Sequence, residues 1–421
     1  MGKFFVFSLG KKFRKAWKNL GPGLVTGASD DDPSGIATYS QAGARFGFQL
    51  LWTAIITYPL MVVIQEMCAR IGIVTRQGLT ANIKKYYPKY VLWFILGLSA
   101  PTIVLNIGAN IAGMGAVGNL ILPVIPSYVF SVFFTIIMMY SFIFWSYNKI
   151  AYILKWLCLT LTCYILIPFI IKTDWPEVLK NAFVPTLRNE KEFYLMLVGI
   201  LGTTISPYLF FWQASMEVEE GMEKKLMVDK KIISTMETDV KGGMFFTTLV
   251  FFFIILTSGS VLFSKGIHDI ETVEDAAKAL QPLAGNFAYL LFAIGVLGTG
   301  FLAIPVLAGS LSYMLSETFG WQEGLNKKFH EAQGFYITMI VSLITGLAIH
   351  LTGISPVKAL IYTALFYGLT APVLIALILH MCNQKKIMGN YTNGKLSNVI
   401  AIIALMIMLL SSGLFLYYQF F

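Results

Sequence analysis

The chain has 421 residues, of which 57% are hydrophobic and only 13% are charged. This composition leaves too little polar surface for a soluble protein and indicates an all-α protein that crosses the bilayer many times. The net charge of +9 comes mostly from short basic loops, so it reports orientation in a membrane and gives no reason to expect a nucleic-acid partner.

Apolar stretches of about 20 residues, the length that spans a bilayer, recur along the whole chain. They predict roughly eleven transmembrane helices, near residues 22–46, 50–74, 91–117, 127–146, 150–171, 194–216, 243–264, 286–315, 335–352, 356–382 and 397–419. On the second span, Glu66 and Arg70 lie four residues apart. This spacing favours a structural ion pair near the cytoplasmic end of that helix over a role in binding the substrate.

Lysine and arginine gather in alternate connections between the spans. They precede the first span, follow the second, and recur after the sixth, eighth and tenth. By the positive-inside rule these segments are cytoplasmic, which places the N-terminus inside the cell and the C-terminus outside, in a multi-pass plasma-membrane protein. The acidic run from Glu217 to Glu223 belongs to one of these segments, and we interpret it as a solvated loop or an interfacial helix.

The first span is interrupted by Ser29-Asp30-Asp31-Asp32-Pro33-Ser34-Gly35. The apolar pieces on either side, Gly21–Ala28 and Ile36–Phe46, are each too short to cross a bilayer alone. A polar loop between two ordinary helices is the alternative. Charge and irregular backbone at membrane depth are tolerated only inside protein or beside a watery cavity, so the stretch predicts a broken helix with an ion or substrate site.

A second interruption, Gly202-Thr203-Thr204-Ile205-Ser206-Pro207-Tyr208, falls in the sixth span, which enters the membrane from the opposite face. Paired interruptions at corresponding positions of two halves are typical of secondary transporters built from inverted repeats. The predicted organisation is a cytoplasmic N-terminal segment (1–20), a first repeat (21–175), a second repeat (190–383) and an additional span (395–421).

The predicted half-helices end at Ser29 to Asp31 and near Thr203, so both direct unpaired carbonyls and the negative pole of the helix dipole toward the break. With the Asp32 carboxylate they form an all-oxygen cavity that favours a hard cation. Asp30 and Asp31 would either add negative potential along the cation path or lie in water at a vestibule mouth. Gln213 would either face the cavity or pack.

Several segments carry a family resemblance: Gly21-Pro22-Gly23, Asp32 to Thr38, Gln41 to Ala44, Leu51-Trp52 and Ile71 to Thr75. Together they resemble the first two helices of the NRAMP divalent-metal transporters, and Gly202 to Pro207 resembles their sixth. The resemblance implies a LeuT-type fold with a 5+5 inverted repeat, and transport of divalent metal ions by alternating access.

Carried over by position, the resemblance implies that Asp32 binds the metal and that Ser29 and Thr203 offer backbone carbonyls to it. Typical members have an asparagine where this chain has Gly35, and a methionine where it has Ser206. Without the thioether, the preference for softer transition metals is lost. The smaller residues also enlarge the pocket, which suits Mg²⁺ because this ion keeps several of its waters.

The chain therefore resembles the NRAMP-related magnesium transporters more than the proton-coupled manganese and iron carriers. Tyr208, Asn110 and Gly113 stand where the resemblance would place titratable groups, and none of them cycles a proton easily near neutral pH. We expect import of Mg²⁺, and also Mn²⁺, by a monomer without proton coupling or a cofactor. The residues expected to line the cavity are Asp31, Thr38, Tyr208, Gln213 and Asn110.

Three alternatives remain. The first is a proton-coupled Mn²⁺ or Fe²⁺ carrier. The second is an organic-solute carrier, for example of amino acids, which would present a half-helix N-terminus to a carboxylate; the acid at Asp32 argues against it. The third is a membrane sensor or an enzyme, but the sequence has no nucleotide-binding motif, no catalytic dyad and no soluble domain large enough to hold one. The expected partners are thus a divalent metal ion and the lipid bilayer.

Overall fold

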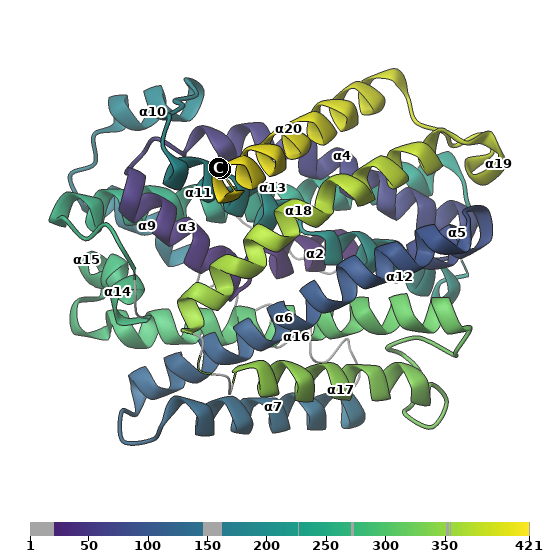
Figure 1. Cartoon of the computed structure of the whole chain (residues 1–421), viewed down its shortest axis with the longest axis horizontal. Helices are drawn as coiled ribbons and strands as arrows, with labels where there is room; N and C mark the ends of the chain where they lie inside the picture. Colours follow the sequence, from purple (N-terminus) through teal and green to yellow (C-terminus); the bar gives the residue numbers. More distant parts are fainter. Residues whose placement is uncertain are drawn as a thin grey trace, which may run out of the picture.

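A computed structural model describes residues 21–145, 162–225, 227–270, 273–350, 353 and 355–420. All regular elements in these ranges are helices. Figure 1 shows the long helices running across the molecule from one end to the other. The short helix α5 (Leu79–Tyr86) marks one end, which we call the α5 end, and α10 (Trp175–Phe183), α14 (Val273–Ala277) and α15 (Gln281–Ala284) lie at the other.

Nine spans in the described ranges are long and apolar enough to cross a bilayer. They are formed by α4 (Trp52–Thr75), α6 (Lys89–Ile121), α7 (Ser127–Phe144), α11 (Lys191–Thr204) with α12 (Pro207–Glu223), α13 (Lys230–Val261), α16 (Ala288–Phe319), α17 (Gln333–His350), α18 (Pro356–Asn383) and α20 (Lys395–Phe420). The predicted all-helical membrane fold is confirmed. Of the fifth predicted span, α9 (Cys163–Ile170) is described, whereas residues 146–161 and the predicted N-terminal segment 1–20 lie outside the described residues.

Both predicted interruptions are breaks within a helix. The first span consists of α2 (Pro22–Asp30) and α3 (Pro33–Phe46), separated only by Asp31 and Asp32, and the sixth breaks between α11 and α12. In each case a proline begins the second half, where its missing N–H costs no helical hydrogen bond. A polar loop between two ordinary helices is therefore the wrong interpretation of the first interruption.

The helices at the α5 end are longer than the hydropathy predicted. Helix α12 continues to Glu223, and α13 begins at Lys230. The Glu217 side chain is buried, and Glu219 accepts hydrogen bonds from the backbone N–H groups of Leu325 at 3.2 Å and Asn326 at 2.8 Å. The acidic run is therefore the end of a packed helix and not a solvated loop, because contacts distant in sequence stabilise its polar turns.

The polar extension of α13 supplies the ion-pair partners of Glu66 and Arg70, which were predicted to pair with each other within α4. Lys241 Nζ lies 3.2 Å from Glu66 Oε1, and Arg70 Nη2 lies 3.5 Å from Glu237 Oε1. The predicted pairing of Glu66 with Arg70 along one helix is thus wrong. Both residues instead connect α4 to α13.

Small residues bring α2 and α13 into close contact. A Cβ atom on Gly27 would lie 2.3 Å from the carbonyl oxygen of Gly243, and one on Gly243 would lie 2.1 Å from that of Gly23. Backbones approach this closely in membranes only where both helices present small residues. The contact fixes the position of α2, and hence of the carboxylates at its end.

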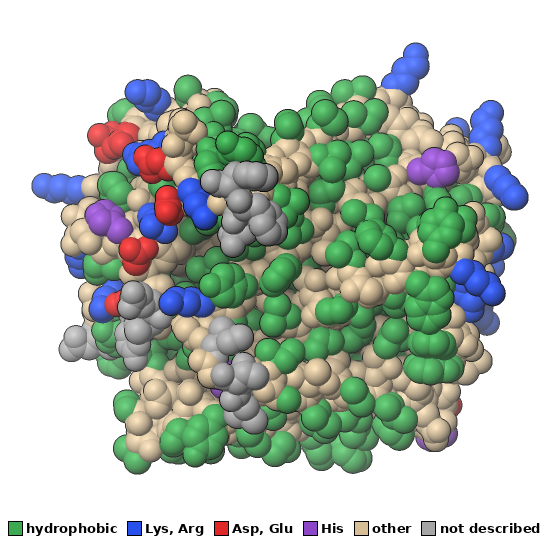
Figure 2. All heavy atoms as spheres, viewed as in Figure 1, with side chains coloured by type: hydrophobic (Ala, Val, Ile, Leu, Met, Phe, Trp, Pro, Cys, Tyr) green, Lys and Arg blue, Asp and Glu red, His purple; other side chains and the backbone are tan. Residues whose placement is uncertain are grey.

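The face of the molecule seen in Figure 2 is mostly hydrophobic between its two ends. At the α5 end the visible charged side chains are lysines and arginines, whereas red and blue side chains are mixed at the opposite end. Lys84 and Lys85 of α5 and Lys385 and Lys386 of α19 (Lys385–Met388) contribute to the basic end. The apolar band is the surface that a bilayer would cover.

Two adjacent glycines of α13 give a matched test of this packing. We expect Gly243→Ala to destabilise the protein by about 1–3 kcal/mol, the usual cost of overpacking. Gly242→Ala should be neutral or stabilising by up to about 1 kcal/mol, because a Cβ there meets no atom within 4 Å. Thermal unfolding of the two purified variants measures the difference, and equal melting temperatures would contradict the close approach.

Candidate functional site

The ends of the four half-helices meet at one place. The Tyr208 hydroxyl of α12 donates to the Ser29 carbonyl oxygen of α2 at 2.9 Å. A Cβ on Gly35 of α3 would lie 3.2 Å from the Asp30 carbonyl oxygen and 3.5 Å from Thr203 Oγ1 of α11. Residues far apart in the sequence are thus brought together around the two breaks.

The Asp32 carboxylate accepts three hydrogen bonds. Its Oδ1 accepts from the Gly35 backbone N–H at 2.8 Å, so the side chain caps the N-terminus of α3. Its Oδ2 accepts from the Asn106 and Asn110 side-chain amides of α6 at 3.2 Å and 3.1 Å. The carboxylate is only 2% exposed. These donors fix its orientation and offset part of the cost of burying its charge.

Asn106 is a contact that the sequence reasoning missed. Its Oδ1 accepts from Asn110 Nδ2 and from Thr363 Oγ1 of α18, both at 3.2 Å. The two asparagines lie four residues apart in the stretch 103–118, which is otherwise apolar, and therefore share one face of the helix. That spacing is the signal that would have found Asn106, because two buried amides on one helical face require a polar partner.

Asp30 and Asp31 are as deeply buried as Asp32, with 1% and 0% of their surface exposed. The alternative in which they lie in water at a vestibule mouth is therefore wrong. Thr247 Oγ1 of α13 donates to Asp30 Oδ2 at 3.4 Å. Asp30 Oδ1 and both side-chain oxygens of Asp31 accept no hydrogen bond from the described residues.

Two hydroxyls expected at the site are bonded to their own helices. Ser206 Oγ donates to the Thr203 carbonyl oxygen at 2.6 Å, in the turn that ends α11. Thr38 Oγ1 donates to the Ser34 carbonyl oxygen at 2.8 Å. The methyl group of Thr38 lies 3.4 Å from the position that a Cβ on Gly199 would occupy, so Thr38 packs between α3 and α11.

Gln213 lies between the break and the α5 end. Its Oε1 accepts from Thr26 Oγ1 of α2, and its Nε2 donates to Glu217 Oε1 at 2.9 Å. Thr26 and Glu217 both lie between the break and the α5 end. Gln213 thus bridges the two half-helices and is fully buried.

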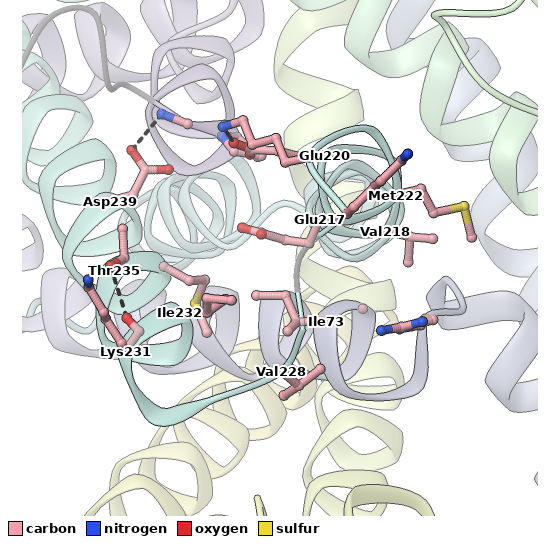
Figure 3. A pocket seen from close by; sticks show the side chains of 18 residues that line it. Ile73, Glu217, Val218, Glu220, Met222, Val228, Lys231, Ile232, Thr235 and Asp239 are labelled. Atoms are coloured by element: carbon pink, nitrogen blue, oxygen red, sulfur yellow. Dashed lines mark hydrogen bonds and ion pairs between the residues drawn. The ribbon is translucent and has the colours of Figure 1, made fainter.

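A cavity of about 770 Å³ opens beyond this bridge at the α5 end, between α2, α4, α12 and α13. Figure 3 shows Glu217 and Asp239 directed into it from α12 and α13. Asp239 also accepts hydrogen bonds from the backbone N–H groups of Gly21 at 3.0 Å and Gly23 at 2.7 Å, at the start of α2. The nine residues of α2 span about 13 Å, and this distance separates the cavity from the break.

Burial changes the pKa of a carboxyl group, that of Glu323, in the loop that follows α16. Burial and, to a lesser extent, the negative charge of Glu317 raise the pKa of Glu323 to about 8, against the opposing effect of Lys327. Glu323 lies at the α5 end and makes no contact with the residues at the break that the structure describes.

The donor set at the break consists of oxygen atoms. In the described ranges, no three His, Cys, Asp or Glu side chains form a group of the kind that holds a resident metal ion. The carboxylates instead stand where two helices end, and helix C-termini present carbonyl oxygens. Such an arrangement suits a cation that passes through, because part of its coordination comes from backbone and retained water.

Comparison with known proteins places these features in a wider group. The family model described as "Natural resistance-associated macrophage protein-like" (Nramp) matches residues 23–418. A divalent metal cation transporter, MntH, of Caldanaerobacter subterraneus subsp. tengcongensis is 25% identical over 415 residues, covering 97% of this chain and 95% of the relative.

Solved structures agree on the fold. The manganese transporter of Eremococcus coleocola superposes with a TM-score of 0.73 at 18% identity, covering 94% of this chain and 86% of that one. MhsT in complex with L-phenylalanine gives a TM-score of 0.63 at 14% identity, covering 93% and 98% of the two chains. The expected LeuT-type arrangement is thereby confirmed.

Proposed function

This chain belongs to the Nramp family, and from that membership we propose that it is a secondary transporter of divalent metal cations that works by alternating access. The ion is proposed to bind at the break, with Asp32 as its charged ligand and with Ser29 and Thr203 offering backbone carbonyls. Gly35 and Ser206 are proposed to belong to the same site. Relatives of similar length that carry the name divalent metal cation transporter support the substrate class.

The observation that carries the proposal is the burial of three consecutive carboxylates where two helices end. Asp30, Asp31 and Asp32 are each no more than 2% exposed. An ionised carboxylate without compensation costs several kcal/mol when it is buried. A cation at this place removes that cost, whereas an anionic substrate would increase it.

The orientation proposed is that of an importer in the plasma membrane, with the α5 end in the cytoplasm. The lysines of α5 and α19 gather at this end (Figure 2), as the positive-inside rule requires of a cytoplasmic surface. The membrane potential then acts on a divalent cation with about 4.6 kcal/mol per 100 mV, twice the single-charge value, in the direction of uptake.

The ion that we propose is Mg²⁺, with Mn²⁺ as a second substrate. Typical family members have a methionine where this chain has Ser206, so an oxygen replaces a sulfur. They have an asparagine where this chain has Gly35, so a side-chain ligand is missing. Sulfur ligands favour softer metals, so their loss removes the discrimination against Mg²⁺. The expected enlargement of the pocket at Gly35 is wrong, because a Cβ there would lie 3.1 Å from Tyr39 Cε2 and 3.2 Å from the Asp30 carbonyl oxygen. The oxygen-only donor set nevertheless suits an ion that keeps several of its waters.

We expect Asp32→Ala to abolish saturable Mn²⁺ uptake into proteoliposomes, because the charged ligand is lost. Asp32→Asn should abolish it as well, although its amide oxygen can still cap α3 at the Gly35 N–H. If both variants lose uptake, the cause is therefore the missing charge and not the missing helix cap.

Asp174→Asn is the matched control, because Asp174 caps the surface helix α10 through the Glu177 N–H. It should transport like the wild type. Normal saturable uptake by a correctly inserted Asp32→Asn protein would contradict the proposed binding site.

If Mg²⁺ is the transported ion, the order in which other metal ions inhibit Mn²⁺ uptake should differ from that of a transition-metal carrier. In the same liposomes, Mg²⁺ at about its usual millimolar abundance should inhibit Mn²⁺ uptake, and Cd²⁺ should have no advantage over Mn²⁺. A Ser206→Met variant should regain Cd²⁺ preference, because it restores a soft ligand. Strong inhibition of the wild type by Cd²⁺ together with inert Mg²⁺ would return this chain to the transition-metal carriers.

We also predict that uptake moves no protons. Coupling needs a group that changes protonation between the two access states, and Tyr208 and Asn110 are poorly suited to that near neutral pH. A pH-sensitive dye inside liposomes held at a clamped potential should stay flat while Mn²⁺ enters. Acidification that scales with metal entry would favour the alternative, a proton-coupled Mn²⁺ or Fe²⁺ carrier.

Glu323, in the loop after α16, provides the control for this measurement, because burial raises its pKa to about 8. Glu323→Gln should leave the dye trace as flat as in the wild type. Any pH dependence of the uptake rate that Glu323→Gln removes then reflects the charge of this loop and not the movement of a coupled proton.

A further inference from the structure

We propose that Asp30 and Asp31, together with Thr247 of α13, form a second divalent-cation site on the opposite side of the break from the Asn106 and Asn110 amides that bind Asp32. The inference rests on the proposed function, because its ion is the transported species. It goes beyond that function by assigning the break two adjacent cation positions instead of one.

The Asp32 carboxylate is already well supplied with hydrogen-bond donors. It accepts one backbone N–H and two side-chain amides at 2.8–3.2 Å. Those donors come from α3 and α6, so the Asp32 side chain is directed to that side of the break. Its remaining capacity suits a single ion that keeps part of its own water shell.

The two preceding carboxylates, Asp30 and Asp31, lack such donors. Three of their four oxygens accept no hydrogen bond from the described residues, and the fourth accepts a long one of 3.4 Å from Thr247 Oγ1. None of the ion pairs between described residues involves Asp30 or Asp31. Buried polar groups are normally satisfied, so these oxygens require a ligand that the chain itself does not provide.

The chemistry of these groups favours a divalent cation as the ligand. Two neighbouring carboxylates and a hydroxyl offer oxygen atoms only, which suits a hard cation such as Mg²⁺ or Mn²⁺. A divalent ion also matches the charge of two ionised carboxylates, whereas a monovalent ion would leave one charge unpaired in a buried place. The C-terminus of α2 adds the negative pole of its dipole at the same point.

The proposed second site and Asp32 face different helices. The hydroxyl that contacts Asp30 belongs to α13, whereas the amides that contact Asp32 belong to α6. The packing of Gly27 against Gly243 holds the end of α2 against α13. The carboxylates of one short segment are thus divided between two sides of the break, and each side has its own set of oxygens.

The test is equilibrium binding of Mn²⁺ to the purified full-length protein in nanodiscs, followed by electron paramagnetic resonance, which separates free from bound Mn²⁺. The wild type should bind a second Mn²⁺ ion beyond the first. Asp31→Asn and the double variant Asp30→Asn/Asp31→Asn should lose one ion and keep the other. Asp32→Asn should lose the complementary ion.

Thr247→Val separates a ligand site from a general effect of charge, because it removes the hydroxyl and keeps both carboxylates. We expect it to weaken the second ion about tenfold, equivalent to about 1.4 kcal/mol. If the two aspartates supplied only negative potential, Thr247→Val would change nothing and Asp31→Asn would weaken a single bound ion. Asp174→Asn again serves as the control for an unrelated surface aspartate.

The outcomes distinguish this inference from the proposed function. A wild type that binds one Mn²⁺, lost in Asp32→Asn and retained in Asp31→Asn, overturns the second site and leaves the transporter assignment intact. A wild type that binds no Mn²⁺ and takes up none overturns both. Variants that are not monodisperse are replaced by Thr247→Val, whose shape is close to that of the native residue.

Discussion

The structure depends on one constraint, which is that three consecutive carboxylates are buried in the middle of a membrane protein. Desolvation of each ionised carboxylate costs several kcal/mol, more than any single hydrogen bond returns. The break in the first span offsets part of this cost. An interrupted helix leaves backbone groups free to bond the carboxylates, whereas an intact helix would use them in its own hydrogen bonds. Asp32 uses one of these groups, the Gly35 N–H of α3, and draws the rest of its donors from α6.

The neighbouring helices are arranged to hold this segment in place. Glycines at the contact let α2 lie directly against the backbone of α13, and Asp239 of α13 caps the first N–H groups of α2. Helix α2 has no capping side chain of its own, so α13 supplies the anion that its N-terminus favours. One helix therefore positions both ends of α2, which accounts for the length of α13 beyond its apolar part.

Between the break and the cavity at the α5 end, α2 and α12 are joined by polar side chains. Thr26 bonds to Gln213, and Gln213 bonds to Glu217 at the wall of the cavity. In a low-dielectric interior such a chain holds its members in one geometry, because a broken bond would leave a buried group unsatisfied. The buried carboxylates are thus separated from the cavity by a bridge that both half-helices share.

The breaks themselves could be predicted from the sequence, because Pro33, Pro207 and the adjacent acids are local signals that act on their own helices. The surroundings of the break could not be predicted in the same way. Thr247 lies 217 residues from Asp30, and Asn106 lies 74 residues from Asp32, so only the packing of whole helices brings them together. Glu66 makes the same point, since local spacing favoured Arg70 and the fold supplied Lys241 instead. Periodicity finds the apolar faces of helices, whereas a buried polar contact depends on which faces meet, and in this chain the chemistry lies in those contacts.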